Sequence, residues 1–134
     1  MNLGKIKIHD LKRIRTEKGD VYHGIKSTDV GFYGFNEMYF SQIRYNQVKG
    51  WKRHNIMIMN LIVPVGNVKF KFTVDGCEYR EFSIGDLNYK RITVPPGIWF
   101  SFEGLSKENY VVNVSNILHD PEESENIELN SFNL

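Results

Sequence analysis

The segment VKFKFTV, residues 68–74, constrains the fold more than any other part of this chain. Its apolar residues stand at positions 68, 70, 72 and 74, with polar residues between them. Side chains of a β-strand alternate between its two faces, so this period of two predicts a strand with one buried face. Asp75-Gly76 follows as a tight-turn signal. We therefore expect residues 77–84, CEYREFSI, to return beside it as the second strand of a hairpin.

Short β-branched and aromatic segments recur along the rest of the chain, and no helical periodicity of useful length interrupts them. Pro95-Pro96 marks a strand boundary, because proline cannot donate to a strand ladder. Such strands at regular intervals predict an all-β sandwich or barrel. The 134 residues suffice for one domain, in which residues 121–134 form a polar, acidic tail expected to be a loop or irregular arm. The further strands are expected over residues 38–45, 54–65, 89–94, 98–105 and 109–118.

Charge and cysteine content exclude several classes of protein. The formal net charge of +1 argues against nucleic-acid binding, and we interpret the basic first half and the acidic tail as solvated surface. Cys77 is the only cysteine, which excludes an internal disulfide and a cysteine-rich zinc site. No apolar segment approaches the ~18 residues of a membrane span, and the N-terminus does not resemble a signal peptide. A cytoplasmic protein is expected.

The stretch VKGWKRH, residues 48–54, holds the residues with the clearest chemical potential. Lys52 and His54 are two residues apart, so on a strand they face the same side, while Trp51 and Arg53 face the other. A neighbouring cation lowers the pKa of an unpaired imidazole, which keeps His54 neutral at pH 7 as a proton-abstracting base requires. Lys52 is also suited to stabilise an enolate. The alternative is a surface position, where Lys52 binds a phosphate or a neighbouring carboxylate.

Other polar side chains fall within or beside apolar strands. Residues 37–41 place Glu37, Tyr39 and Ser41 on one face, where they line a ligand cavity or meet solvent. Asn60 and Asn113 lie in apolar runs, and a buried amide costs free energy unless it pairs with backbone or with a ligand. Trp99 after PPG is either a stacking wall for a ligand or part of the core.

Four motifs together resemble the dTDP-4-dehydrorhamnose 3,5-epimerase family, in its short, cupin-like branch. They are VKGWKRH, NLIVPVGNVKF, YKRITVPPGIWFSFEGL and VNVSNILHDPEE, and the resemblance spans residues 9–128. It implies a single-domain cupin-type jelly roll, or double-stranded β-helix. It also implies a homodimer that acts on a nucleotide-linked 4-keto-deoxysugar. Exposed aromatic segments such as YGFNEMYF also favour pairing of two copies, which covers sheet edges.

The sequence departs from the family pattern at four places. By register, Lys52 stands where the longer epimerases carry their catalytic histidine, Phe100 replaces a second histidine, and Val112 replaces the acid tyrosine. The late aspartate that supports the family histidine has no clear match. The four ligand positions of metal-binding cupins hold Lys52, His54, Met59 and Phe100, and one ligand of four does not make a catalytic metal site. We therefore expect no metal and no other cofactor.

These observations lead to one hypothesis and two alternatives. The hypothesis is a metal-independent epimerase or isomerase of a nucleotide-linked 4-keto-deoxysugar in bacterial surface-polysaccharide precursor synthesis. The alternatives are a sugar ketoisomerase of the same superfamily and a non-catalytic cupin that binds a sugar nucleotide or a protein partner. The candidate catalytic residues are His54 as base, Lys52 as anion stabiliser and Tyr39 as replacement acid. The candidate substrate-binding residues are Lys49, Arg53, Glu37, Asn60, Trp99 and Asn113.

Overall fold

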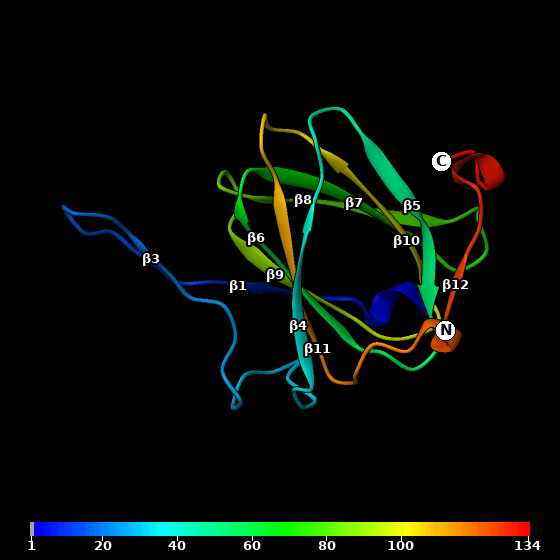
Figure 1. The fold of residues 1–134 in the computed structure, drawn as a ribbon, viewed down its shortest axis with the longest axis horizontal. Helices are drawn as coiled ribbons and strands as arrows, with labels where there is room; N and C mark the ends of the chain where they lie inside the picture. Colours follow the sequence, from blue (N-terminus) through cyan, green and yellow to red (C-terminus); the bar gives the residue numbers. More distant parts are fainter. Residues whose placement is uncertain (1) are drawn as a thin grey trace.

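The computed structural model describes residues 2–134 and consists of two antiparallel five-stranded sheets packed face to face. A small two-stranded sheet projects from this body (Figure 1). The predicted all-β class is confirmed, and the arrangement is that of a cupin-type jelly roll. From β4 onward consecutive strands alternate between the two sheets, except that β7 and β8 form a hairpin in one sheet, so residues far apart in sequence meet across the barrel.

The first sheet has the strand order β1-β9-β6-β11-β4. Strands β6 and β11 at its centre are buried along most of their length and are mainly apolar, with Asn60, Asn113 and Ser115 as buried polar exceptions. Its strands are β1 (Lys7–Asp10), β9 (Lys90–Val94), β6 (Met59–Val65), β11 (Tyr110–Ser115) and β4 (Glu37–Gln42).

The second sheet has the order β12-β5-β10-β7-β8. The strands of this sheet are β12 (Ser124–Asn126), β5 (Val48–His54), β10 (Trp99–Gly104), β7 (Asn67–Thr73) and β8 (Tyr79–Gly85).

The remaining elements are β2 (Arg13–Ile14), β3 (Val21–Tyr22) and the 3-10 helices η1 (Leu3–Lys5), η2 (Pro121–Glu123) and η3 (Leu129–Ser131). None of the helices within residues 2–134 is long and apolar enough to cross a membrane.

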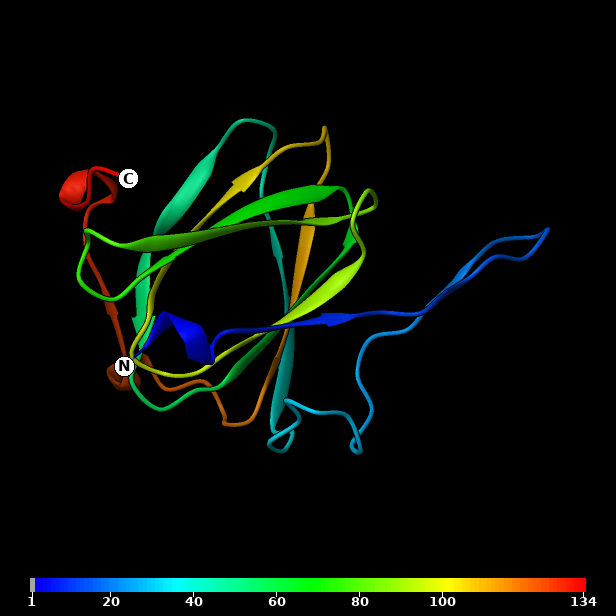
Figure 2. The same cartoon turned by 180° about the vertical axis from the view of Figure 1, so that it is seen from behind.

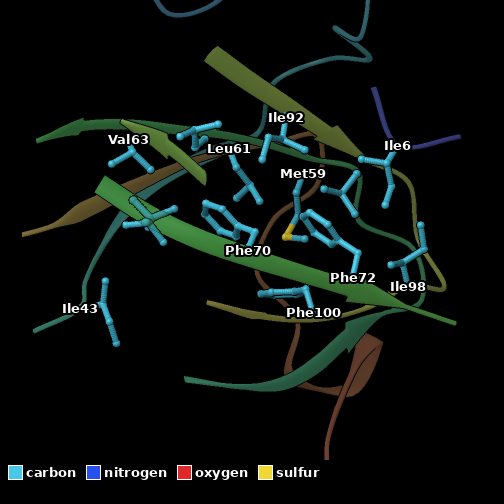
Figure 3. Packing of buried hydrophobic residues seen from close by; sticks show 14 of the residues in the cluster. Ile6, Ile43, Met59, Leu61, Val63, Phe70, Phe72, Ile92, Ile98 and Phe100 are labelled. Carbon is cyan, nitrogen blue, oxygen red and sulfur yellow. The ribbon is translucent and has the colours of Figure 1, made fainter. Parts of the chain in front are cut away.

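The main core fills the space between the two sheets. The alternation predicted for residues 68–74 is confirmed over 68–72, where Val68, Phe70 and Phe72 are fully buried and Lys69 and Lys71 lie on the outer face. It ends there, because Thr73 is buried too and Val74 lies beyond the end of β7 and is only partly buried. Figure 3 shows the rings of Phe70 and Phe72 directed at the side chains of the opposite sheet. Each such fully buried side chain contributes about 1.5–3 kcal/mol relative to an exposed one. The strict period of two therefore fixes which face of β7 points inward.

Several strand boundaries differ from the sequence prediction by one to three residues, and two differences change the layout of the strands. Residues 54–65 are not one strand, because β5 ends at His54 and β6 begins at Met59. His54 therefore closes its own strand, and the loop between the strands bends toward the C-terminal tail. The hairpin of β7 and β8 is present, but its connection spans residues 74–78 instead of a two-residue turn. In it the Asp75 carboxylate accepts the backbone N–H groups of Cys77 and Glu78 at 2.8 and 3.1 Å.

The C-terminal tail is more ordered than the expected irregular arm. Strand β12 pairs with β5, placing Ser124 opposite His54 and Asn126 opposite Lys52. Farther along, the ring of Phe132 lies edge-on to Trp51 and Trp99, with centroid distances of 5.2 and 6.1 Å. The last residues therefore cover the outer face of the second sheet beside β5 (Figure 1).

Residues 11–36 form a long excursion between β1 and β4. Its first half is the arm made by β2 and β3, which points away from the barrel in both views (Figures 1 and 2). Arg13 ties the base of this arm to the body through Asp86 at 2.9 Å and also pairs with Asp20. Its second half lies over the outer face of the first sheet, where Gly31 is too close for a side chain: a Cβ there would lie 2.4 Å from Thr93 Oγ1.

Candidate active site

A cavity of about 280 Å³ lies between the two sheets. Its lining divides into an apolar floor and a polar rim. Figure 3 shows several floor side chains, among them Phe70 and Phe100, projecting between the sheets. The floor is made by Met59, Leu61, Phe70, Phe100, Phe102 and Val111. The rim is made by Tyr39, Ser41, Lys49, Gly50, Lys52, His54, Asn113 and Asn126.

Strand β5 brings Lys52 and His54 to the cavity. Both line it, as the spacing of two predicts, and Trp51 and Arg53 lie on the other face with Phe132 and Glu125. The pairing with β10 shifts register between Phe100 and Ser101, which marks a β-bulge on this strand. Gly50 permits the close approach there, because a Cβ on it would lie 2.6 Å from the Cβ of Ser101.

His54 is paired with a carboxylate that comes from the C-terminal tail. Its Nδ1 hydrogen-bonds Glu123 Oε1, and the two side chains are only 4% and 2% exposed. An ionised carboxylate only accepts, so Nδ1 carries the proton and Nε2 keeps its lone pair. The other oxygen, Oε2, accepts backbone N–H groups from Asn55, Ile56 and Met57 at 3.0–3.2 Å. Glu123 therefore fixes the ring, its tautomer and the loop that follows β5.

The charge states of this pair follow from opposing effects. Burial lowers the pKa of His54, hydrogen bonding and charge from Glu123 work against burial, and the Lys52 ammonium lowers the pKa further. The net direction is downward, so the ring is neutral at pH 7. Burial alone would raise the pKa of Glu123, but hydrogen bonds from His54 and from backbone N–H groups outweigh it and lower the pKa. The predicted lowering by Lys52 is present, but burial is the larger cause.

Tyr39 and Asn113 form the polar wall that the first sheet contributes. They lie directly opposite each other on β4 and β11, so their side chains share one face of the sheet. Asn113 Nδ2 donates to the Tyr39 hydroxyl oxygen at 2.9 Å. Burial raises the pKa of Tyr39, which keeps the phenol protonated at pH 7, and this hydrogen bond works against the rise. The phenol therefore retains a proton that it can donate.

Five of the nine predicted site residues thus line one cavity: His54, Lys52, Tyr39, Lys49 and Asn113. Lys49 stands at its edge, where its ammonium donates to the backbone oxygen of Gln42 at 2.6 Å. A groove between β4 and β5 begins at the same place and shares Ser41 and Lys49 with the cavity.

The other four predicted residues lie elsewhere, which corrects the sequence interpretation. Glu37 accepts the backbone N–H of His119 at 2.8 Å, beyond the cavity. Asn60 faces the outer side of the first sheet, where Nδ2 donates to Gly31 O at 2.9 Å. Arg53 and Trp99 stack on each other on the outer face of the second sheet, with the guanidinium carbon 4.7 Å from the ring centroid. Trp99 belongs to packing and not to a ligand wall.

Sequence reasoning missed three polar residues of the site. Ser41 was placed on the correct face of its strand but given no role, and Asn126 and Glu123 lie in the tail that was interpreted as solvated surface. Glu123 is buried, unlike the other carboxylates of that tail. It stands 69 residues from His54 in sequence, so no spacing links them. The one local signal is Asp120-Pro121, a helix-start signature that opens η2.

Within residues 2–134 there is no group of three or more His, Cys, Asp or Glu side chains arranged to hold a metal ion. Lys52 carries an ammonium group, and the ring of Phe100 stacks on the His54 imidazole with the ring centroids 6.0 Å apart. The polar chemistry at this site therefore belongs to His54, Glu123, Lys52 and Tyr39.

Among solved structures, the chain is similar to several enzymes of nucleotide-sugar chemistry. A dTDP sugar isomerase from Desulfovibrio desulfuricans G20 is 29% identical, with a TM-score of 0.89, over 95% of this chain and 86% of that one. A mutant of the 3,4-ketoisomerase QdtA from Thermoanaerobacterium thermosaccharolyticum, in complex with TDP-4-keto-6-deoxyglucose, is 15% identical with a TM-score of 0.80, over 92% and 88% of the two chains. A dTDP-4-dehydrorhamnose 3,5-epimerase from Bacillus anthracis is 12% identical with a TM-score of 0.83, over 97% and 82%.

At the level of sequence the match is to a family. No curated protein matches the chain. The profile of the family described as "FdtA: WxcM-like, C-terminal" matches residues 4–131, which is nearly the whole chain. The resemblance recognised in the motifs is confirmed by the solved epimerases and isomerases of the same fold. The chain belongs to the FdtA, WxcM-like C-terminal family.

Proposed function

We propose that this protein is an isomerase of a nucleotide-linked 4-keto-6-deoxysugar and that it works without a metal. The observation that carries the proposal is the buried His54–Glu123 pair, which presents a neutral imidazole to the cavity beside the Lys52 ammonium. A base that is neutral at pH 7 and lies next to a cation is suited to remove a proton beside a ketone. The choice of substrate is supported by two solved relatives, a dTDP sugar isomerase and a 3,4-ketoisomerase in complex with TDP-4-keto-6-deoxyglucose.

The proposed reaction begins at the carbon next to the keto group. Nε2 of His54 takes its proton, and the C–H electron pair becomes the enolate, whose negative oxygen lies near Lys52. In a ketoisomerase the proton then returns to the former keto carbon, while a hydroxyl proton moves from one oxygen to its neighbour. Tyr39 is suited to that second transfer because its hydroxyl gives a proton to one oxygen and recovers one from the other.

We favour movement of the keto group over inversion of a stereocentre. Val112, at the position of the epimerase tyrosine, packs with Ile62 and Val114 away from the cavity. The solved relative with 29% sequence identity is a dTDP sugar isomerase, and one with 15% identity is a 3,4-ketoisomerase in complex with TDP-4-keto-6-deoxyglucose. Epimerisation by the same base is the second candidate, because both reactions pass through an enolate.

The nucleotide is assigned to the groove beside the cavity. Protein pockets that bind small molecules have volumes of roughly 300–1,000 Å³. The cavity, at about 280 Å³, therefore suits the sugar without its nucleotide. The adjoining groove measures about 980 Å³, and its walls include Arg44, Tyr45 and Lys107. A diphosphate that passes Lys49 would meet these cations, and the exposed Tyr45 ring offers a surface on which a base stacks.

We also propose a homodimer. Strand β4 is an edge of the first sheet, and its outward side chains Met38 and Phe40 are 51% and 64% exposed. Tyr33 and Phe35, just before this strand, extend the apolar surface. Exposed apolar side chains along an unpaired edge favour association with a second copy. Light scattering is expected to give twice the chain mass for the wild type and a shift toward monomer for Phe40→Glu; a wild-type monomer at micromolar concentration contradicts this.

The proposed activity is tested with a panel of nucleotide-linked 4-keto-6-deoxysugars, with product structure determined by proton NMR. The expected product carries its keto group on the neighbouring carbon, at an unchanged rate after chelator treatment. A product inverted at one carbon selects the epimerase. Binding of these sugars without turnover contradicts the isomerase and leaves a binding protein. Loss of activity in chelator that returns with added metal contradicts the metal-free mechanism.

A further inference from the structure

We infer that Asn113 is a positioning residue for Tyr39, which it keeps oriented as a proton donor toward the substrate; this inference rests on the proposed function. The sequence allowed Asn113 to contact a sugar hydroxyl directly. The geometry instead gives its amide nitrogen to the Tyr39 hydroxyl at 2.9 Å and to Met57 Sδ at 3.5 Å. Asn113 therefore acts on the reaction through Tyr39.

The direction of this hydrogen bond decides what the phenol can do. A tyrosine hydroxyl has one proton and can both donate and accept. Because Asn113 Nδ2 donates, the Tyr39 oxygen accepts and its own proton stays free for a partner in the cavity. With the amide turned by half a rotation, the carbonyl oxygen would take the Tyr39 proton instead. Tyr39 would then offer the cavity no proton at all.

Two neighbours favour the productive orientation of the amide. Met57 Sδ is a weak acceptor and cannot donate, so it suits the Nδ2 end of Asn113 and not the Oδ1 end. The backbone N–H of Met57 is itself held by Glu123 Oε2 at 3.2 Å. One carboxylate therefore orients His54 with one oxygen and, through Met57, supports the amide that orients Tyr39.

The free-energy cost of burying the Asn113 side chain also indicates a functional role for this residue. Asn113 is 3% exposed, and its Oδ1 is buried without a hydrogen-bond partner among residues 2–134. A buried acceptor without a partner carries the full free-energy cost of its desolvation. An apolar side chain of similar size would avoid that cost at this position. Stability alone does not explain an asparagine here, whereas the orientation of Tyr39 does.

The first test measures Tyr39 directly and needs no substrate. Tyrosine labelled with 13C at the ring carbon that carries the hydroxyl is titrated by NMR, and Tyr39→Phe identifies the Tyr39 signal. A donor to the phenol oxygen stabilises the phenolate. We therefore expect Asn113→Leu to raise the pKa of Tyr39 while thermal unfolding shows the fold intact. An unchanged Tyr39 pKa in Asn113→Leu overturns the inference, whether or not any sugar is turned over.

The second test is a double-mutant cycle on kcat with the sugar that the wild type converts. Loss of one neutral hydrogen bond predicts a fall in kcat of roughly tenfold for Asn113→Leu, with little change in KM. In the Tyr39→Phe background the same substitution is expected to have no further effect. Full additivity of the two losses, or a rise in KM alone, overturns the inference in favour of direct substrate contact.

The third test uses Asn113→Asp, which changes the donor into a group that titrates. Above its pKa the introduced carboxylate accepts the Tyr39 proton, so kcat is expected to fall at least as far as in Asn113→Leu. As pH falls and the carboxyl protonates, its O–H can donate to Tyr39 and kcat recovers in part. Asn113→Leu should show no such recovery. Identical pH profiles for the two variants overturn the inference. If the wild type converts no sugar of the panel, the proposed function fails, and the NMR titration still decides the role of Asn113.

Discussion

Two clusters of buried and half-buried polar side chains lie on opposite faces of the first sheet, and they differ in what covers them. The outer-face cluster consists of His9, Asn60, Arg91 and Thr93, linked by side-chain hydrogen bonds. The backbone of residues 30 and 31 closes over it and accepts from Arg91 and Asn60. The inner cluster, Tyr39 and Asn113, faces the cavity opposite His54. Each cluster holds one buried polar atom with no partner within residues 2–134, Arg91 Nε outside and Asn113 Oδ1 inside.

Buried polar side chains alone therefore do not identify a functional site. Both clusters contain an asparagine from the centre of the sheet, and β11 pairs Asn113 with Leu61 and Val114 with Asn60. This offset of one residue sends the two amides to opposite faces. On the outer face every Asn60 contact is a structural one made by the protein. On the inner face the polar groups border empty space that a ligand can enter.

The largest expected difference between the two faces is between their histidines. His54→Asn removes the proposed base, so turnover is expected to fall by about 10²–10⁴-fold while the fold persists. His9→Asn is the matched control, because within residues 2–134 the one side-chain hydrogen bond of His9 is to Thr93 Oγ1, at 2.9 Å on the outer face. It should leave kcat within a factor of about two and cost about 0.5–1.5 kcal/mol of stability. Equal losses of activity in the two variants would contradict the assignment of the inner face as the site.

Glu123→Gln tests whether the tail carboxylate sets the chemistry of His54. The amide NH₂ can donate to Nδ1, which moves the ring proton to Nε2 and removes the basic lone pair from the cavity. We expect turnover to fall on the order of 10²-fold or more, by the logic of a misoriented base. Because Glu123 works to raise the His54 pKa, the imidazole that remains should titrate at lower pH, as followed by NMR of its ring protons. An unchanged rate would show that the pairing serves packing only.

Asn60→Leu tests the outer face by stability instead of rate. It removes an acceptor that Arg91 Nη1 and Thr93 Oγ1 share, and leaves part of a buried cation unsatisfied. A loss of about 2–4 kcal/mol in the free energy of unfolding is expected, with kcat of the folded protein preserved. Asn113→Leu should give the opposite result, a reduced kcat with stability nearly unchanged. For both variants, denaturant titration measures the free energy of unfolding and kinetics on the same preparations measure kcat.

The smallest expected change is the shift of the pH profile in Lys52→Met, a variant that also lowers turnover because it removes the proposed enolate stabiliser. The His54 pKa lies below its ordinary value of 6.5, so the neutral base persists to lower pH, and the acid limb of kcat/KM should fall below pH 6.5. Removing the nearby ammonium raises the His54 pKa, so the limb should move to higher pH. Solvent at the cavity edge screens the charge, which limits the movement to less than about one pH unit. A limb that moves to lower pH would contradict the role given to Lys52.

The sequence predicted those features that depend on local periodicity. The alternation in residues 68–74 identified the inward face of β7, and the spacing of Lys52 and His54 correctly placed both at the cavity. Features that depend on pairing between distant strands were not predictable. Asn60 and Asn113 look alike in sequence, and only the register of β6 against β11 separates them. Glu123 was hidden because a buried carboxylate in an acidic tail has the same sequence context as its solvated neighbours.

The proposal that the inner face is a proton-abstracting site is tested most directly by hydrogen exchange. Wild type, His54→Asn and His9→Asn are incubated in D₂O with nucleotide-linked 4-keto-6-deoxysugars, and deuterium at the carbon next to the keto group is followed by NMR. We expect rapid incorporation by the wild type and by His9→Asn, and a loss of about 10²–10⁴-fold in His54→Asn. Binding of the sugar by the wild type without any exchange, or undiminished exchange in His54→Asn, would contradict it.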